Sequence, residues 1–123
     1  MGLSARSIEE EWMASFTGTW EVVSSPDFDE GYLRMEVAPY VILKQSGERV
    51  EGKYQVGLQT GTLDGWLESE NLMLFSFEGM DELEEMHGAG RATLSGDHLT
   101  FELRYYLGDE YVFDCERSKS LRQ

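Results

Sequence analysis

Three tyrosines stand where a polar group could be held inside an apolar interior. In a period-two pattern, Tyr54, Tyr105 and Tyr111 each share one side of a predicted strand with apolar residues. A phenol that faces an oily interior needs a hydrogen-bonding partner, so such tyrosines can anchor the polar end of a small hydrophobic or aromatic molecule. The walls of this predicted ligand-binding pocket are Phe75, Phe77, Phe101 and Leu103. The same seven residues also suit an ordinary filled core, and the sequence leaves both interpretations open.

Two other side chains are of types that can act in catalysis. The alternation places His87 on the outward side, but nearby Gly88 and Gly90 permit a bulge that would turn it inward to bind haem iron or act as a general base. Cys115 has inward parity near Arg117; a buried thiol is ordinarily inert, whereas a neighbouring guanidinium lowers its pKa. Nucleophile elbows, zinc spacings and phosphate-cradling loops are absent from the sequence. We therefore expect no catalytic residue, no metal and no cofactor, and enzymatic activity is the less favoured interpretation.

The stretch 78–85 is strongly acidic and lies just before His87. Its carboxylates and the imidazole are potential metal ligands, but the ligand spacing of an EF-hand loop is absent. We interpret this stretch as a solvated linker between two strands.

Period-two alternation runs through most of the chain and predicts the scaffold that positions these side chains. The predicted strands are 17–24, 37–46, 49–58, 60–68, 71–78, 85–94, 98–106 and 110–117. Short links with turn-forming residues make successive strands antiparallel neighbours. Each strand has one dry face, which closure into a barrel buries while it removes the sheet edges. We predict an all-β fold, an eight-stranded antiparallel up-and-down β-barrel, in which Gly61, Gly65, Gly88 and Gly90 mark bends or leave room for a ligand.

The residues before the first strand predict a short helix. Ser7 and Glu10 form a capping box, and Ile8, Trp12 and Phe16 then fall on one face of a helix over 7–16. Such a helix would lie as a cap on the barrel. The chain is expected to be a single domain over 1–123, with the barrel at 17–117 and a tail at 118–123.

The charge of the chain excludes some partners. With 24 acidic and 10 basic residues its net charge is −14, which repels phosphate backbones and anionic lipid. We therefore expect neither nucleic acid nor a membrane as a partner. One cysteine allows no internal disulfide, and residues 1–15 contain no apolar run of signal-peptide length, so a cytoplasmic location is expected.

The segment Phe16-Thr17-Gly18-Thr19-Trp20 resembles the Phe-x-Gly-x-Trp opening of calycins, the superfamily of lipocalins, fatty-acid-binding proteins and avidins. In calycins this tryptophan lies at the closed end of the barrel and a basic residue of the last strand packs over it. The resemblance assigns these positions to Trp20 and Arg117, with the opposite end open. An indole face attracts a guanidinium, whose donors can also bind carbonyls of the incoming chain. The fatty-acid carboxylate site has no clear counterpart, so the resemblance implies a fold and not a ligand.

Three functional hypotheses follow. The first is a non-catalytic, lipocalin-like barrel whose partner is a small hydrophobic or aromatic molecule in its interior. The second is a calycin-type enzyme or haem-binding barrel that uses His87. The third is a structural or dimerisation module with a filled core, in which outward apolar residues form a homodimer surface. That surface would comprise Tyr40, Ile42, Trp66 and Tyr106.

Overall fold

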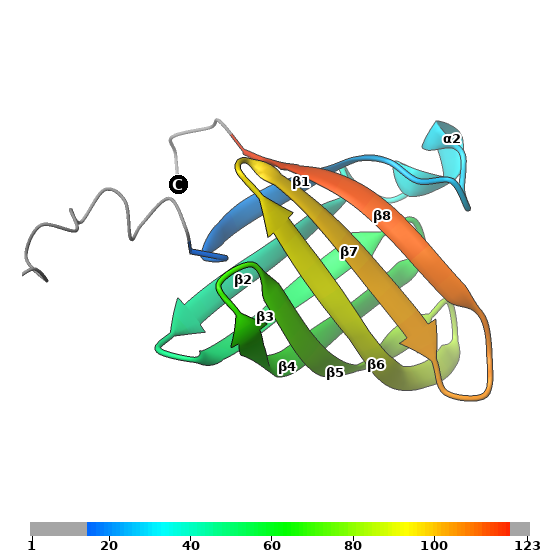
Figure 1. Ribbon diagram of the computed structural model, residues 1–123. Coiled ribbons are helices and arrows are strands. Elements are labelled where there is room, and N and C mark those ends of the chain that lie inside the picture. The colour runs from blue at the N-terminus through cyan, green and yellow to red at the C-terminus, as the bar shows by residue number, and fades with distance from the viewer. Residues whose placement is uncertain (1–14, 119–123) are drawn as a thin grey trace, which may run out of the picture.

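The computed structural model describes residues 15–118, which form a closed β-barrel of eight strands (Figure 1). The strands are β1 (Gly18–Ser24), β2 (Tyr40–Ser46), β3 (Arg49–Val56), β4 (Gln59–Ser69), β5 (Leu72–Asp81), β6 (Glu84–Ser95), β7 (His98–Tyr105) and β8 (Glu110–Arg117). One short helix, α2 (Glu30–Leu33), lies in the link between β1 and β2. No helix within residues 15–118 is long and apolar enough to cross a bilayer.

Every strand pairs antiparallel with the next one in the sequence, and β8 returns to pair with β1. Five links have only two residues, at 47–48, 57–58, 70–71, 82–83 and 96–97. Such tight hairpins leave no room for crossovers, so the order is up-and-down. The predicted eight-stranded antiparallel barrel is therefore confirmed.

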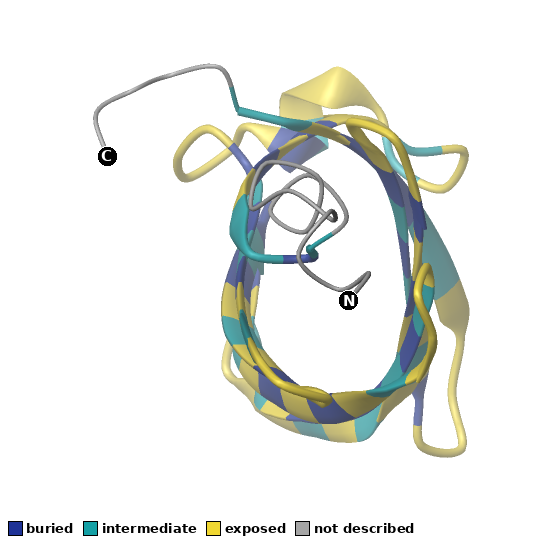
Figure 2. Cartoon of the chain, turned by 60° about the vertical axis from the view of Figure 1, so that its left-hand side comes forward, coloured by how far each residue is buried: buried dark blue, intermediate teal, exposed yellow. Residues whose placement is uncertain are grey.

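Buried and exposed residues alternate along the strands (Figure 2), as expected when every second side chain points into the barrel. The largest side chains without exposure include Trp20, Phe16, Phe101 and Phe113. Most of the core is apolar, and Gln59 is its single buried polar residue within the described part of the chain. Burial of this alternating apolar face is what drives the closure of the sheet.

Two expectations about local structure need correction. The acidic stretch 78–85 is not a linker, because β5 continues to Asp81 and β6 begins at Glu84. The backbone ladder with β4 extends to the Gln59–Asp81 pair, and this tertiary pairing overrides the poor strand propensity of acidic residues. The helix over 7–16 finds no support: Ser15 and Phe16 are not helical, and residues 7–14 lie outside the described residues. The tail beyond Ser118 lies outside them as well.

Link 25–39 covers the end of the barrel that the resemblance left open. Asp29 caps α2, since its carboxylate accepts a hydrogen bond from the Tyr32 amide at 2.9 Å. Leu33 is buried, and its carbonyl accepts a hydrogen bond from the Gly57 amide at 3.1 Å. A side chain at Gly57 would collide with the Tyr32 ring, and the φ of +61° there also favours glycine. The link is therefore seated on the β3–β4 turn as a lid.

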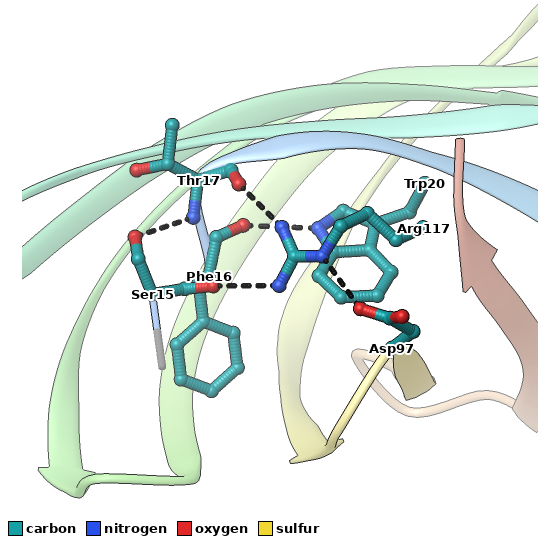
Figure 3. Close-up of polar contacts among 6 residues, drawn as sticks. All are labelled: Ser15, Phe16, Thr17, Trp20, Asp97 and Arg117. Carbon is teal, nitrogen blue, oxygen red and sulfur yellow. Dashed lines mark hydrogen bonds and ion pairs between the residues drawn. The ribbon is translucent and has the colours of Figure 1, made fainter. Parts of the chain in front are cut away.

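The opposite end is sealed around Trp20. The guanidinium carbon of Arg117 lies 4.3 Å from the centroid of the Trp20 ring. Arg117 also donates to the carbonyls of Thr17 at 2.9 Å and Ser15 at 3.1 Å, and it pairs with Asp97 at 3.2 Å (Figure 3). The Trp20 indole N–H donates to the Phe16 carbonyl at 2.9 Å. These contacts tie the incoming chain, the first strand and the last strand into one plug.

We expect Arg117→Met to lower the free energy of unfolding by about 2–4 kcal/mol, because it removes charged donors from half-buried carbonyls and a cation from the indole face. Arg91→Met is the matched control. It removes only an exposed ion pair with Glu102, so it should cost about 0–1 kcal/mol. Urea denaturation of the two variants measures the difference. Equal losses would show that the plug contributes no more than a surface ion pair.

Candidate functional site

The seven predicted pocket residues all lie along the inner wall. Six of them are at most 5 % exposed, and Tyr111 is half-buried at the lid end. Their rings form a continuous chain of contacts. The centroids of Phe75 and Phe101 are 5.3 Å apart, those of Phe77 and Tyr105 are 5.7 Å apart, and those of Tyr105 and Tyr111 are 5.4 Å apart. These distances are typical of direct ring packing. The structure therefore brings the seven together, and in the middle of the barrel they pack on one another.

The room that inward glycines leave is taken by the aromatic rings of the chain itself. A Cβ at Gly90 would lie 2.6 Å from Cζ of Phe75, and one at Gly61 would lie 2.7 Å from the Tyr54 hydroxyl. Each ring therefore rests directly on the neighbouring backbone. At these positions glycine serves the packing of the core.

A buried polar network lies between this core and the lid. Gln59 is 1 % exposed, and its Oε1 accepts a hydrogen bond from the Tyr105 hydroxyl. Its Nε2 donates to the hydroxyl of Tyr32 at 3.3 Å, and that hydroxyl also accepts from the Leu58 amide at 3.3 Å. The network thus links the wall of the barrel to α2. Gln59 was missed in the sequence, although it shares inward parity with Gly61 and Leu63 along its strand.

Two more polar groups lie beside this network. Tyr54 is 2 % exposed, and its hydroxyl makes no hydrogen bond to any residue that the structure describes. Asp81 lies directly across from Gln59 in the antiparallel β4–β5 pair, so both side chains are on the inward side. The lid end therefore combines an amide, a carboxylate and several phenols at the mouth of an aromatic interior.

The electrostatics of this end follow from burial. Burial raises the pKa of Tyr54 and of Tyr105 above the ordinary tyrosine value, and the negative charge of Asp81 adds to both effects. Burial also raises the pKa of Tyr111, together with its hydrogen bond to Asp109. The pKa of Asp81 is raised by burial and by the like charges of Glu82 and Glu84. The mouth thus resists additional negative charge.

The lid places an aromatic ring of its own in the mouth. The Phe28 ring lies 4.6 Å from the Tyr32 ring, 4.8 Å from the Tyr111 ring and 5.9 Å from the Phe113 ring, measured between centroids. Phe28 is half-buried and belongs to no strand. The mouth therefore contains a seat for one aromatic ring, formed by the lid and β8.

Neither candidate catalytic side chain enters the site. His87 is exposed on the outer wall and stacks on Tyr106 at a centroid distance of 5.1 Å, so the outward parity of the sequence holds and no bulge turns it inward. Cys115 is fully buried, and burial together with Asp114 raises its pKa. The thiol therefore has the character of an ordinary buried cysteine, and the alternative of a pKa lowered by Arg117 is not realised, because desolvation dominates.

Within residues 15–118, the four residues of the predicted homodimer surface do not form one continuous patch. These residues face outward but lie at different heights of the barrel. Tyr40 pairs with Gln55 near the lid end, whereas Trp66 pairs with Leu74 near the sealed end. Tyr106 follows β7 and lies against His87. A hollow of about 360 Å³ over β6–β8 is lined by Arg91–Glu102 and Arg104–Glu110 ion pairs. Within residues 15–118, no three His, Cys, Asp or Glu residues are grouped to hold a metal ion.

The closed barrel, with its Trp20–Arg117 plug and its aromatic interior, has the fold of calycin-type barrels. Two solved structures show the likeness. A redesigned β-barrel, mFAP1, bound to DFHBI, matches with a TM-score of 0.57 at 15 % identity, over 82 % of this chain and 94 % of that chain. Human cRBP IV matches with a TM-score of 0.51 at 16 % identity, over 85 % and 98 % of the two chains. No protein-family model and no curated protein matches the sequence.

Alkaline titration tests the environment of the tyrosines. Because burial favours the neutral phenol, Tyr54 and Tyr105 should ionise above the ordinary pKa of 10. They therefore stabilise the fold at lower pH, and this contribution is lost as pH rises past 10. The near-ultraviolet tyrosinate band should show a late fraction that shrinks in Tyr54→Phe. The outer-wall control Tyr106→Phe retains both buried phenols, and a late fraction lost only in that control would contradict the assignment.

Proposed function

We propose that this protein is a non-catalytic binding barrel for a small hydrophobic or aromatic molecule, which it holds at the lid end of its interior. The observation that carries this proposal is the seat of Phe28. A loop residue supplies a ring that packs between Tyr32, Tyr111 and Phe113, directly above the Gln59 network. A ligand with an aromatic ring can take the same seat.

Exchange of Phe28 for a ligand ring needs only a local opening of the lid. Phe28 contacts three rings, and each ring pair contributes about 0.5–1.5 kcal/mol beyond burial. Their sum is below the stability of a typical domain, so the seat can be vacated without unfolding the barrel. Both ends of the link remain tied down. At its start, Asp27 accepts from the Val112 amide at 2.8 Å and Ser25 donates to the Val112 carbonyl at 2.6 Å. At its end, the Pro39 carbonyl accepts from the Val22 amide at 3.2 Å. Link 25–39 thus has anchored ends around a replaceable ring.

The polar groups below the seat would orient the ligand. Tyr105 and Gln59 already form a hydrogen-bonded pair, and the Tyr54 hydroxyl is left with an unused donor and acceptor. A few placed polar groups in an apolar lining are typical of small-molecule sites. The similar mFAP1 barrel, solved with DFHBI bound, supports this use of the fold.

The filled-core hypothesis is the second candidate, and the ring packing of Phe75, Phe77 and Phe101 favours it for the middle of the barrel. The two functions occupy different depths. The core between Trp20 and Phe101 holds the fold together, and the ligand would bind between Phe77 and the lid. The haem and enzyme hypotheses lack their inward imidazole, since His87 is on the outer wall.

Removal of the lid ring tests the proposal. Phe28→Ala vacates the seat, so a fluorescent apolar probe such as a naphthalene should bind about tenfold more tightly to the variant than to the unmodified protein. The variant should lose about 1–3 kcal/mol of stability as a half-buried ring is removed. Met35→Ala, which truncates an exposed side chain of the same link, is the control and should change neither value. Probe fluorescence and urea denaturation measure the two effects.

A bulky residue below the seat gives the complementary test. Tyr105→Trp should block the probe, whereas Tyr106→Trp on the outer wall should not, with circular dichroism to verify that both variants fold. Saturable binding that is insensitive to Phe28 and Tyr105 would place the site elsewhere. Absence of binding to either the unmodified protein or Phe28→Ala would leave the filled core as the function of the interior.

A further inference from the structure

The mouth of the barrel is acidic on its inner side. Asp81 faces inward across from Gln59, and Glu84 follows across from Asp81 at the rim. Within the strands between residues 18 and 117, no Lys or Arg side chain points inward at the lid end. Arg104 faces outward in an ion pair with Glu110, and Arg117 lies at the opposite, sealed end. A ligand that enters here therefore meets negative charge alone from the wall.

The Asp81 carboxylate has no counter-charge. It is half-buried and forms no ion pair or hydrogen bond with the described residues. Arg34, the basic residue at the C-cap of α2, forms an ion pair with Glu30 at 3.4 Å. Loss of solvent and the nearby carboxylates of Glu82 and Glu84 make the charge of Asp81 costly, and a cation placed beside it would relieve that cost.

The tyrosines near Asp81 also favour a positive charge. The charge of Asp81 acts on both Tyr54 and Tyr105, and the Phe77 ring contacts both of their rings, so two phenols and an aromatic cluster lie together below the mouth. Aromatic faces attract ammonium groups, and the attraction grows where water is excluded. Tyr54 is 2 % exposed as a residue, and its hydroxyl, which has no hydrogen-bond partner in residues 15–118, lies against Gly61 and supplies an acceptor there.

We infer that the ligand of this barrel is an organic cation, an amine-bearing aromatic or hydrophobic molecule whose ammonium group lies between Asp81 and the tyrosines while its ring takes the seat of Phe28. This inference rests on the proposed binding function and specifies its ligand class. Fatty acids and other carboxylates are rejected, because no basic side chain meets them and Asp81 repels them. A bare metal ion is rejected as well, since the described residues offer no set of three ligands.

Three probes with one aromatic body separate these possibilities: 2-naphthylmethylamine, 2-naphthylmethanol and 2-naphthoate. Calorimetric titration at neutral pH uses the full chain and its Phe28→Ala variant. The amine should bind on the order of tenfold more tightly than the alcohol, through one partly desolvated charge pair and the aromatic faces, and the carboxylate should bind least. Added salt should weaken binding of the amine and leave binding of the alcohol unchanged.

Asp81→Asn should reduce the affinity for the amine to that for the alcohol. Glu78→Gln is the matched control, because it removes one charge from the outer side of the same strand and so alters the net charge equally. Both sites are at least partly exposed, and circular dichroism verifies their folding. Alcohol binding equal to or tighter than amine binding, or equal effects of the two substitutions, would overturn the cation inference while the binding function stands. If none of the three probes binds to either protein, the inference and the proposed function fail together.

Discussion

The structure depends on the pairing of its first strand with its last. Trp20 stands opposite Arg117 in the β1–β8 ladder, and the guanidinium caps the indole while it holds the carbonyls of the chain that enters the barrel. Without this pairing the sheet has two free edges and an apolar face open to water, which are costly together. The contact joins residues almost a full chain apart, so it closes the barrel only after all intervening hairpins are in register.

The interior is divided by depth. In the middle of the barrel, rings such as Phe75 and Phe101 pack on one another, and the inward Gly90 lets Phe75 lie against the backbone. Toward the lid, the packing admits the amide of Gln59 and the phenols of Tyr105 and Tyr32, every one hydrogen-bonded. A polar network of this kind is tolerated in a core only when its members are satisfied. This network therefore separates the aromatic core of the barrel from the lid.

The lid and the mouth belong to one electrostatic and aromatic unit. Phe28 closes the seat from outside, Tyr32 bonds to the inner network, and Asp81 supplies an unpaired charge at the rim. The net charge of −14 keeps anions away from the whole surface, and the mouth repeats that sign at close range.

The sequence by itself determined the alternation, and with it the eight strands, the barrel and the inward side of Tyr54, Tyr105 and Phe77, because side-chain period is a local property of a strand. It also placed Trp20 with Arg117 through a short motif. Only the tertiary structure decided that 78–85 extends a hairpin, that Gln59 bonds to Tyr105, and that Phe28 fills the mouth. These features depend on cross-strand register and on the path of a link that has no periodicity, and neither is encoded in neighbouring residues.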